Sequence, residues 1–280
     1  MNRDKTKYPI FIISKGRWES RLTVKTLDKM NIEYRIVVEP SEFSQYSAVI
    51  DKDNIIITPE NFSERGQGGI PVRNFVFETA IKEGHKKHWI LDDNIRYIGM
   101  VNKNCRTPCG NIKPFLICED FTDRFKNIAL SGMNYTMFVI PQSKQPPFQV
   151  NTRIYSNLLI NHEIPFRWRG RYNEDTDLCL RCLKTGWNTI LFNAFVIKKA
   201  PTLTMKGGNT DTIYNTGDKR REFAESLRRL HPDCVKVVWR YNRWHHDVDY
   251  TQFQNRFLEY RDDYNPTENK EYKFKLVKKK

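Results

Sequence analysis

The sequence predicts an α/β fold, with a Rossmann-like N-terminal half, a mixed central sheet and helices on both faces. Two observations indicate this class. Short apolar runs alternate with amphipathic segments through the first 91 residues, as in βαβ units with a parallel sheet. Several of these runs end on polar side chains, at the sheet edge where open α/β sheets bind ligands.

The N-terminal half, residues 1–100, contains four such units. Residues 8–13, 34–38, 54–58 and 88–91 are predicted strands, and residues 19–30, 42–50 and 71–82 are predicted helices. Pro71 suits the first turn of the third helix, and Gly84 suits its end. Right-handed crossovers between these strands predict a parallel sheet.

The second half, residues 101–265, mixes the two element types. We expect strands at 95–101, 135–140, 153–160, 189–194, 195–199 and 235–239, a polar loop at 102–111, and helices at 119–130, 174–186 and 218–230. Asn173 is placed to cap the helix that begins at Glu174. We predict a single domain over residues 1–265, followed by a basic tail at 266–280.

The composition favours a polyanionic partner. The 47 Lys and Arg residues outnumber the 33 Asp and Glu residues, which gives a net charge of +14, and nucleic acid is the partner that this balance favours. No apolar run approaches the roughly 20 residues of a membrane helix, and the charged N-terminus lacks a signal peptide's apolar region. We therefore expect a cytoplasmic protein with no membrane partner.

An acidic triplet follows the fourth predicted strand. Asp92, Asp93 and Asn94 come directly after the apolar run Trp89-Ile90-Leu91. Clustered carboxylate and amide oxygens are hard ligands that suit Mg²⁺ or Mn²⁺ carrying a phosphate. A strand end closed by a polar turn explains the same residues without a metal.

Polar residues at the other strand ends predict a nucleotide-diphosphate pocket. Ser14, Lys15 and Arg17 follow the first strand, Glu39 ends the second, and Arg73 lies in the first turn of the helix at 71–82. An Arg is unfavourable in that turn by helix-dipole logic, so a nearby anion is a plausible partner. The segment is not a P-loop, and the chain has no GxGxxG fingerprint.

A second acidic cluster opens the helix at 174–186. Glu174 and Asp175 are candidates for a general base, and we favour Asp175. The alternative explanation is structural, because the helix dipole favours acidic residues in a first turn.

Two further groups of residues are ambiguous. Cys105, Cys109 and Cys118 have spacing that is compatible with the start of a zinc site, although a fourth ligand is not evident. Residues 240–250 interleave cations with aromatic side chains, which suits phosphates and stacked bases. Together with Trp168 and its flanking arginines they predict a DNA-binding face, and His245 or His246 is a candidate to complete the metal shell.

Five segments, in this order, carry a resemblance to a known family. The segments are Ser14-Lys15-Gly16-Arg17, Val37-Val38-Glu39-Pro40, Gly69-Ile70-Pro71-Val72-Arg73-Asn74, Trp89-Ile90-Leu91-Asp92-Asp93-Asn94 and Asn173-Glu174-Asp175-Thr176-Asp177-Leu178. With these segments the chain resembles the GT-A glycosyltransferases, in particular the TET-associated, base-J-type DNA glycosyltransferases of phages and some eukaryotes, over roughly residues 8–250.

The resemblance implies a GT-A fold and metal-dependent transfer, with inversion, from a UDP-sugar to a hydroxymethylated pyrimidine in double-stranded DNA. Glucose or a pentose such as arabinose is the expected sugar, and 5-hydroxymethylcytosine or 5-hydroxymethyluracil the expected acceptor. Asp92 and Asn94 would stand at the ends of a DxD-type metal motif for Mn²⁺ or Mg²⁺, and Asp175 would match the base. The enzyme would act as a monomer, in the host cytoplasm if phage-encoded.

Three alternatives stay open from the sequence. The first is a GT-A transferase with a carbohydrate, lipid or protein acceptor. The second is a catalytically silent nucleic-acid-binding protein. The third is a nucleotidyltransferase that uses the same acidic cluster.

Overall fold

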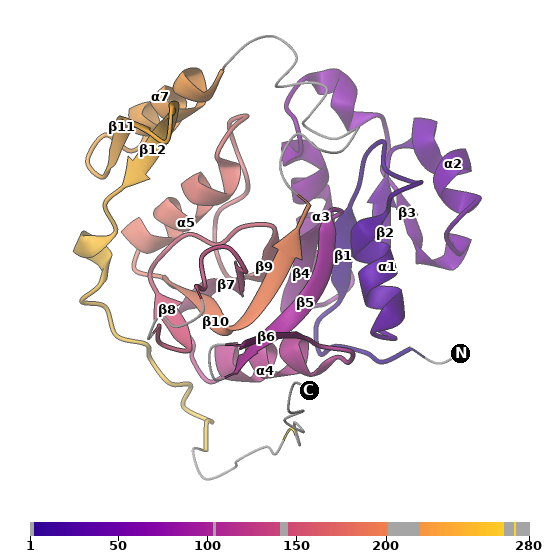
Figure 1. Cartoon of the computed structure of the whole chain (residues 1–280), viewed down its shortest axis with the longest axis horizontal. Helices are drawn as coiled ribbons and strands as arrows, with labels where there is room; N and C mark the ends of the chain where they lie inside the picture. Colours follow the sequence, from indigo (N-terminus) through magenta and orange to yellow (C-terminus); the bar gives the residue numbers. More distant parts are fainter. Residues whose placement is uncertain (1–2, 103–104, 141–144, 201–218, 266–271, 273–280) are drawn as a thin grey trace.

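A computed structural model of the chain describes residues 3–102, 105–140, 145–200, 219–265 and 272. Its centre is a ten-stranded sheet with the order β3-β2-β1-β4-β9-β7-β10-β5-β6, and β8 also pairs with β10 (Figure 1). The predicted basic tail lies outside the described residues, apart from residue 272.

The N-terminal half is a parallel sheet, as predicted. Its strands are β1 (Ile10–Ile13), β2 (Arg35–Val38), β3 (Ile55–Ile57) and β4 (Lys87–Asp92), joined by helices α1 (Leu22–Lys29), α2 (Phe43–Ser47) and α3 (Ile70–Lys82). Strand β1 pairs in parallel with both β2 and β4, and β2 pairs in parallel with β3. Strands buried on both faces read as continuous apolar runs, which explains why β1, β2 and β4 were visible in the sequence.

The second half turns the sheet into a mixed one, which confirms the predicted fold class. Strand β9 runs antiparallel to its neighbours β4 and β7, and β10 runs parallel to β7 but antiparallel to β5. The elements are β5 (Ile95–Asn102), β6 (Cys105–Pro108), α4 (Lys113–Thr122), β7 (Ile128–Tyr135), β8 (Phe148–Val150), β9 (Asn157–Asn161), α5 (Glu174–Lys184) and β10 (Asn188–Lys199).

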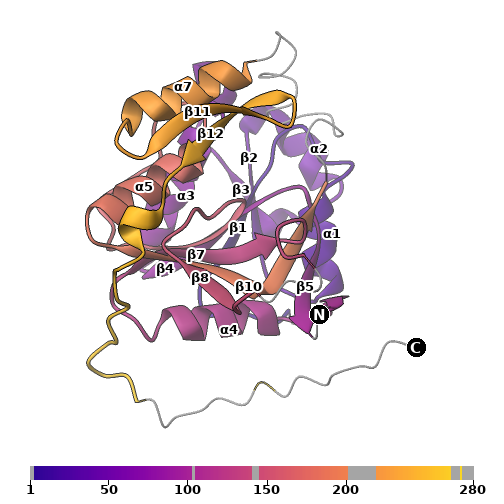
Figure 2. The ribbon, with the colours of Figure 1, turned by 60° about the vertical axis from the view of Figure 1, so that its left-hand side comes forward.

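Helices cover both faces of the sheet. Helices α1 and α4 pack through Leu27 and Phe115 into a core cluster that contains Ile12 of β1. Helices α3 and α5 pack through Phe77 and Leu178 into the cluster on the opposite face (Figure 2). None of the described helices is long and apolar enough to cross a membrane.

Four predictions for the second half were wrong. The helix expected at 119–130 ends at Thr122, and the strand expected at 135–140 is instead β7, which starts at Ile128 and ends at Tyr135. The small residues in the middle of β7 hid this strand from the apolar pattern. The loop expected at 102–111 contains β6, and the two strands expected at 189–199 are one strand, β10, whose register with β7 shifts between Phe192 and Val196.

A C-terminal unit packs beside α5. It consists of α7 (Arg220–Leu230) and the hairpin of β11 (Val235–Arg240) and β12 (Arg243–Val248) (Figures 1 and 2). Leu180 and Leu183 of α5 form a small core with Leu227 of α7 and Val235 of β11. The segment of mixed cations and aromatic residues at 240–250 therefore spans the tip and second strand of a hairpin.

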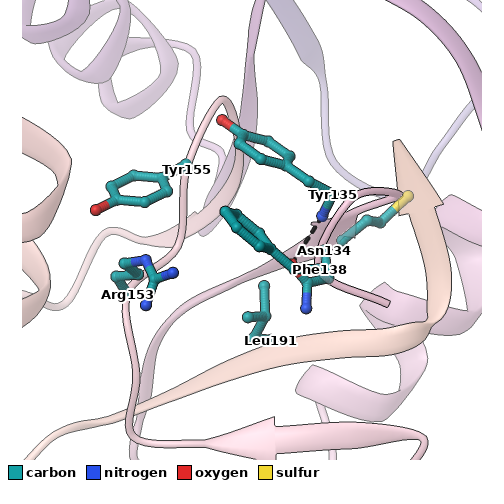
Figure 3. A pocket seen from close by; sticks show the side chains of 7 residues that line it. Asn134, Tyr135, Phe138, Arg153, Tyr155 and Leu191 are labelled. Atoms are coloured by element: carbon teal, nitrogen blue, oxygen red, sulfur yellow. Dashed lines mark hydrogen bonds between the residues drawn. The ribbon is translucent and has the colours of Figure 1, made fainter. Parts of the chain in front are cut away.

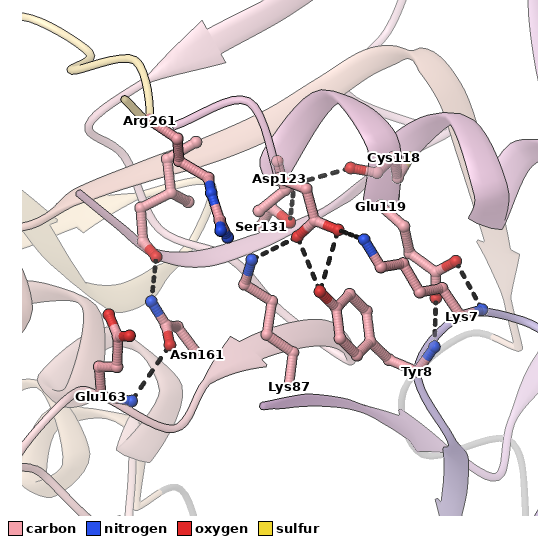
Figure 4. A network of polar contacts seen from close by, with 12 residues as sticks. Lys7, Tyr8, Lys87, Cys118, Glu119, Asp123, Ser131, Asn161, Glu163 and Arg261 are labelled. Carbon is pink, nitrogen blue, oxygen red and sulfur yellow. Dashed lines mark hydrogen bonds and ion pairs between the residues drawn. The ribbon is translucent and has the colours of Figure 1, made fainter. Parts of the chain in front are cut away.

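A polar network ties the amino-terminal side of the sheet to α4 (Figure 4). Asp123 binds the ammonium groups of Lys7 and Lys87, and it accepts hydrogen bonds of 2.9 Å from the Tyr8 hydroxyl. Although burial alone opposes ionisation, these cations hold the pKa of Asp123 below its usual range. Lys87 is itself buried, so its charge depends on this partner.

Replacing Asp123 with Ala should destabilise the fold strongly, because it leaves the buried Lys87 ammonium without a counter-charge. We expect a loss of about 3–5 kcal/mol in the free energy of unfolding, measured by urea denaturation. Asp262→Ala is the matched control, since the Asp262 side chain is 98% exposed. A loss below about 1 kcal/mol for Asp123→Ala would contradict this role.

Candidate active site

The first turn after β1 is held against the end of β4. The Ser14 hydroxyl donates to Asp93 Oδ2 at 2.8 Å, and the Arg17 guanidinium binds the other Asp93 oxygen. The Tyr46 hydroxyl lies 2.6 Å from Ser14 Oγ and accepts from the Arg17 backbone N–H at 3.1 Å. Burial raises the pKa of Asp93, and Arg17 opposes that shift. Ser14, Arg17 and Asp93 therefore lie together in the structure.

The end of β2 forms a neighbouring polar group. Glu39 accepts hydrogen bonds from the backbone N–H and the hydroxyl of Ser63, at 2.7 and 2.6 Å. The Lys15 ammonium lies 3.4 Å from Glu39. Lys15 and Glu39 thus pair with each other and line the edge of the parallel half.

A second charged group is centred on the buried Arg73. Its Nη2 donates to Asp92 Oδ1 at 3.0 Å, its Nε lies 3.7 Å from Glu174, and its Nη1 lies 3.7 Å from Asp175. The anion that the sequence predicted beside Arg73 is therefore a set of three carboxylates. In the described part of the chain, Arg73 Nε and Nη1 have no hydrogen-bond partner.

Sequence reasoning missed Lys199, the last residue of β10. Its ammonium lies 2.7 Å from Asp92 Oδ2 and 2.6 Å from Ser156 Oγ. Burial opposes ionisation of Asp92, but Lys199 and Arg73 outweigh it and hold the pKa of Asp92 well below its usual range. The sequence did contain a signal for Lys199, because this lysine ends an apolar strand at the same edge of the sheet.

The two acidic residues of α5 have different surroundings. Asp175 Oδ1 accepts a 3.0 Å hydrogen bond from the Trp168 indole, whereas burial and the nearby Asp175 carboxylate raise the pKa of Glu174 to about 7. Trp168 is buried, so its assignment to a DNA-binding face was wrong. Asn173 occupies the N-cap position, but its side chain donates to the Phe223 carbonyl instead of capping α5.

A family comparison covers the part of the chain that carries these residues. A sequence model of the TET-Associated Glycosyltransferase family matches residues 8–208, a span that contains the residues of both charged groups. The chain belongs to the TET-associated glycosyltransferase family. It is therefore an enzyme that transfers a sugar from a nucleotide-sugar donor, in a family linked to modified DNA bases. No curated protein matches the chain.

The residues expected to hold a divalent metal in this glycosyltransferase do not fit one as they are arranged. Both Asp92 oxygens already accept from cations, Arg73 and Lys199. A metal ion could bind Asp92 only by displacing Arg73 or Lys199 from these oxygens. Asn94 Oδ1 is buried and lacks a hydrogen-bond partner in the described ranges, but it offers only one neutral oxygen.

The other predicted metal ligands do not assemble either. Within the part of the chain that the structure describes, no three His, Cys, Asp or Glu side chains gather as a metal site. Cys109 and Cys118 are free thiols, and the Cys105 side chain lies outside the described residues. His245 and His246 lie on β12, where burial and then Arg153 lower the pKa of His246 to about 4.

An aromatic hollow, shown in Figure 3, adjoins the charged group. Tyr135, Phe138 and Tyr155 line it, and the Arg153 guanidinium lies 5.5 and 5.4 Å from the Phe138 and Tyr155 ring centres. The Tyr135 hydroxyl lies 2.6 Å from Ser156 Oγ, the atom that also contacts Lys199. The Tyr155 hydroxyl lies 2.9 Å from Thr176 Oγ1, next to Asp175 in sequence. The hollow is thus linked to both acidic elements of the site.

The raised pKa of Glu174 should make stability depend on pH. The folded-state pKa of Glu174, about 7, exceeds the ordinary value of 4.5. The contribution of Glu174 to the free energy of unfolding is therefore fully present below about pH 4.5 and is lost as the pH rises through 7. Glu174→Gln removes this titration, so its free energy of unfolding should fall less than that of wild type between pH 5 and 8, by about 1–3 kcal/mol. Urea denaturation at each pH measures the difference, and parallel curves would refute the shift.

Proposed function

We propose that this glycosyltransferase moves a sugar from a UDP-sugar to the hydroxymethyl group of 5-hydroxymethylcytosine or 5-hydroxymethyluracil in double-stranded DNA, with inversion. The observation that carries the proposal is the position of Asp175. This carboxylate lies at the start of α5, beside the Arg73–Asp92 pair, at the carboxyl edge where parallel sheets bind nucleotides. Glucose, or a pentose such as arabinose, is the proposed sugar, and the enzyme is proposed to act as a cytoplasmic monomer.

The donor nucleotide is proposed to bind along the ends of β1, β2 and β4. The contacts among Ser14, Arg17 and Asp93 fix the turn after β1, and the Lys15–Glu39 pair lies beside it. A rigid turn at this edge suits recognition of a nucleotide base and ribose, because the protein need not order it on binding. The Arg73 group then lies on the side where the diphosphate would extend.

Chemistry at this site needs one proton acceptor and a stabilised leaving group. The acceptor oxygen forms a bond to the anomeric carbon as the bond from that carbon to the β-phosphate oxygen breaks. The electron pair stays on the phosphate, so UDP leaves with one additional negative charge. Asp175 takes the proton of the hydroxymethyl group, and the Trp168 indole holds one of its oxygens in place.

The aromatic hollow is the proposed acceptor subsite. The rings of Tyr135 and Tyr155 are inclined by 30° with centres 6.3 Å apart, and they are the proposed faces for a pyrimidine. A base in duplex DNA is reached most directly by flipping it out of the stack, and aromatic side chains then hold it. The contact of Tyr155 with Thr176 brings this subsite to the helix turn that carries Asp175.

Asp175→Asn should abolish sugar transfer while leaving nucleotide binding largely intact, because it removes the general base and keeps the shape of the side chain. We expect a loss of at least about a hundredfold, since general-base catalysis contributes about 10²–10⁴. The assay incubates a panel of UDP-sugars with hydroxymethylated and plain DNA and analyses the nucleosides by mass spectrometry.

Glu174→Gln is the matched control for this assay, because it removes the neighbouring carboxylate in the same turn. A large loss for Glu174→Gln with near-normal turnover for Asp175→Asn would transfer the role of base to Glu174. Transfer to a carbohydrate, lipid or protein but not to DNA would replace the proposed acceptor.

The hairpin tip should contribute to DNA binding by stacking. Tyr241 is 88% exposed at the turn between β11 and β12, close to several arginines. Tyr241→Ser should weaken binding to duplex DNA by about 1–3 kcal/mol, measured by fluorescence anisotropy at fixed salt. Phe257→Ser is the control, because Phe257 is 86% exposed outside the hairpin. Equal effects of the two substitutions would argue against a DNA-binding hairpin.

A further inference from the structure

We propose that Lys199, together with Arg73, supplies the positive charge that binds the donor diphosphate, so that nucleotide binding needs no divalent metal ion. The inference rests on the proposed UDP-sugar donor. It starts from the geometry of Asp92, whose two carboxylate oxygens accept from Arg73 at 3.0 Å and from Lys199 at 2.7 Å. Two fixed cations thus occupy the carboxylate that was expected to bind the ion.

Each of the two cations has donors to spare. A lysine ammonium has three N–H donors, and Lys199 uses one on Asp92 and one on Ser156. Arg73 is 5% exposed, and its Nε and Nη1 have no hydrogen-bond partner among the described residues, although carboxylates of Glu174 and Asp175 lie 3.7 Å from them. Buried donors are almost always paired, so these two nitrogens are available to a closer acceptor on a ligand. Phosphate oxygens accept hydrogen bonds from both of these side chains.

The position of Lys199 is enforced by its neighbours. Ser156, immediately before β9, has a left-handed backbone with φ of 64°, which is uncommon for a residue other than glycine. This conformation brings the Ser156 hydroxyl within 2.6 Å of both Lys199 Nζ and the Tyr135 hydroxyl. The lysine is therefore held at the junction between the charged group and the aromatic hollow.

These cations match the charge that develops during transfer. When the bond between the anomeric carbon and the β-phosphate oxygen breaks, the departing diphosphate gains one negative charge. Preorganised cations stabilise such charge without having to reorganise, which is the role that a metal ion plays in other enzymes. Lys199 and Arg73 would bind the diphosphate in the ground state and stabilise it further as it leaves.

The test is UDP binding by isothermal titration calorimetry in EDTA and in Mn²⁺ buffers, with the full-length chain. Wild type should bind UDP in EDTA, with a change of less than about twofold on adding Mn²⁺. Lys199→Met should raise the Kd in EDTA by at least about tenfold, as expected for a lost charge-assisted hydrogen bond. Lys199→Arg should retain most of the affinity, because it keeps the charge.

Lys198→Met is the matched control, since Lys198 is the exposed neighbour on the same strand, and its Kd should change by less than about twofold. UDP affinity that appears only with Mn²⁺ would overturn this inference and leave the donor proposal standing. Equal Kd values for wild type and Lys199→Met would also overturn it. No UDP affinity in either buffer would overturn the inference and the donor proposal together.

Discussion

The buried ion pairs around Arg73 are the constraint on which the candidate site depends. A buried guanidinium carries a desolvation cost that is offset only by nearby negative charge. Asp92 supplies a hydrogen bond, and Glu174 and Asp175 supply attraction from 3.7 Å. These carboxylates come from the end of β4 and the start of α5, so the same charge that keeps Arg73 buried also brings the two acidic clusters of the sequence together.

The close contact between the neighbouring strands β7 and β9 positions the other side of the candidate site. A Cβ atom on Gly132 would lie 2.2 Å from the Asn157 carbonyl oxygen, so only glycine allows this approach. Asn157 Oδ1 accepts from the Met133 backbone N–H at 2.6 Å, and its Nδ2 donates to the Met133 carbonyl at 2.9 Å. The side chain thus replaces ladder hydrogen bonds where β9 separates from β7. The chain that precedes β9 is thereby directed toward the sheet edge, where Ser156 contacts Lys199.

The sequence was sufficient to predict the strands of the parallel half but not those in the middle of the chain, and the reasons are physical. Strands such as β1 and β4 are buried on both faces, and their apolar runs are unambiguous. Strand β7 is also buried, but it contains Ser131, Gly132 and Asn134, which carry no apolar signal. Motif order identified Asp92 and Asp175. It did not identify Lys199, because that contact joins residues 107 positions apart.

The same limit explains why a motif alone does not determine the chemistry at Asp92. Residue types in a row indicate which ligands are available, but the partners of a carboxylate decide what it binds. Asp93 lies next to Asp92, yet its carboxylate binds Arg17 and Ser14, and the pKa of Asp93 is raised whereas that of Asp92 is lowered. Cations on separate elements therefore give adjacent, chemically identical groups different roles: Asp93 ties down the turn after β1, and Asp92 holds Arg73 and Lys199 at the centre of the site.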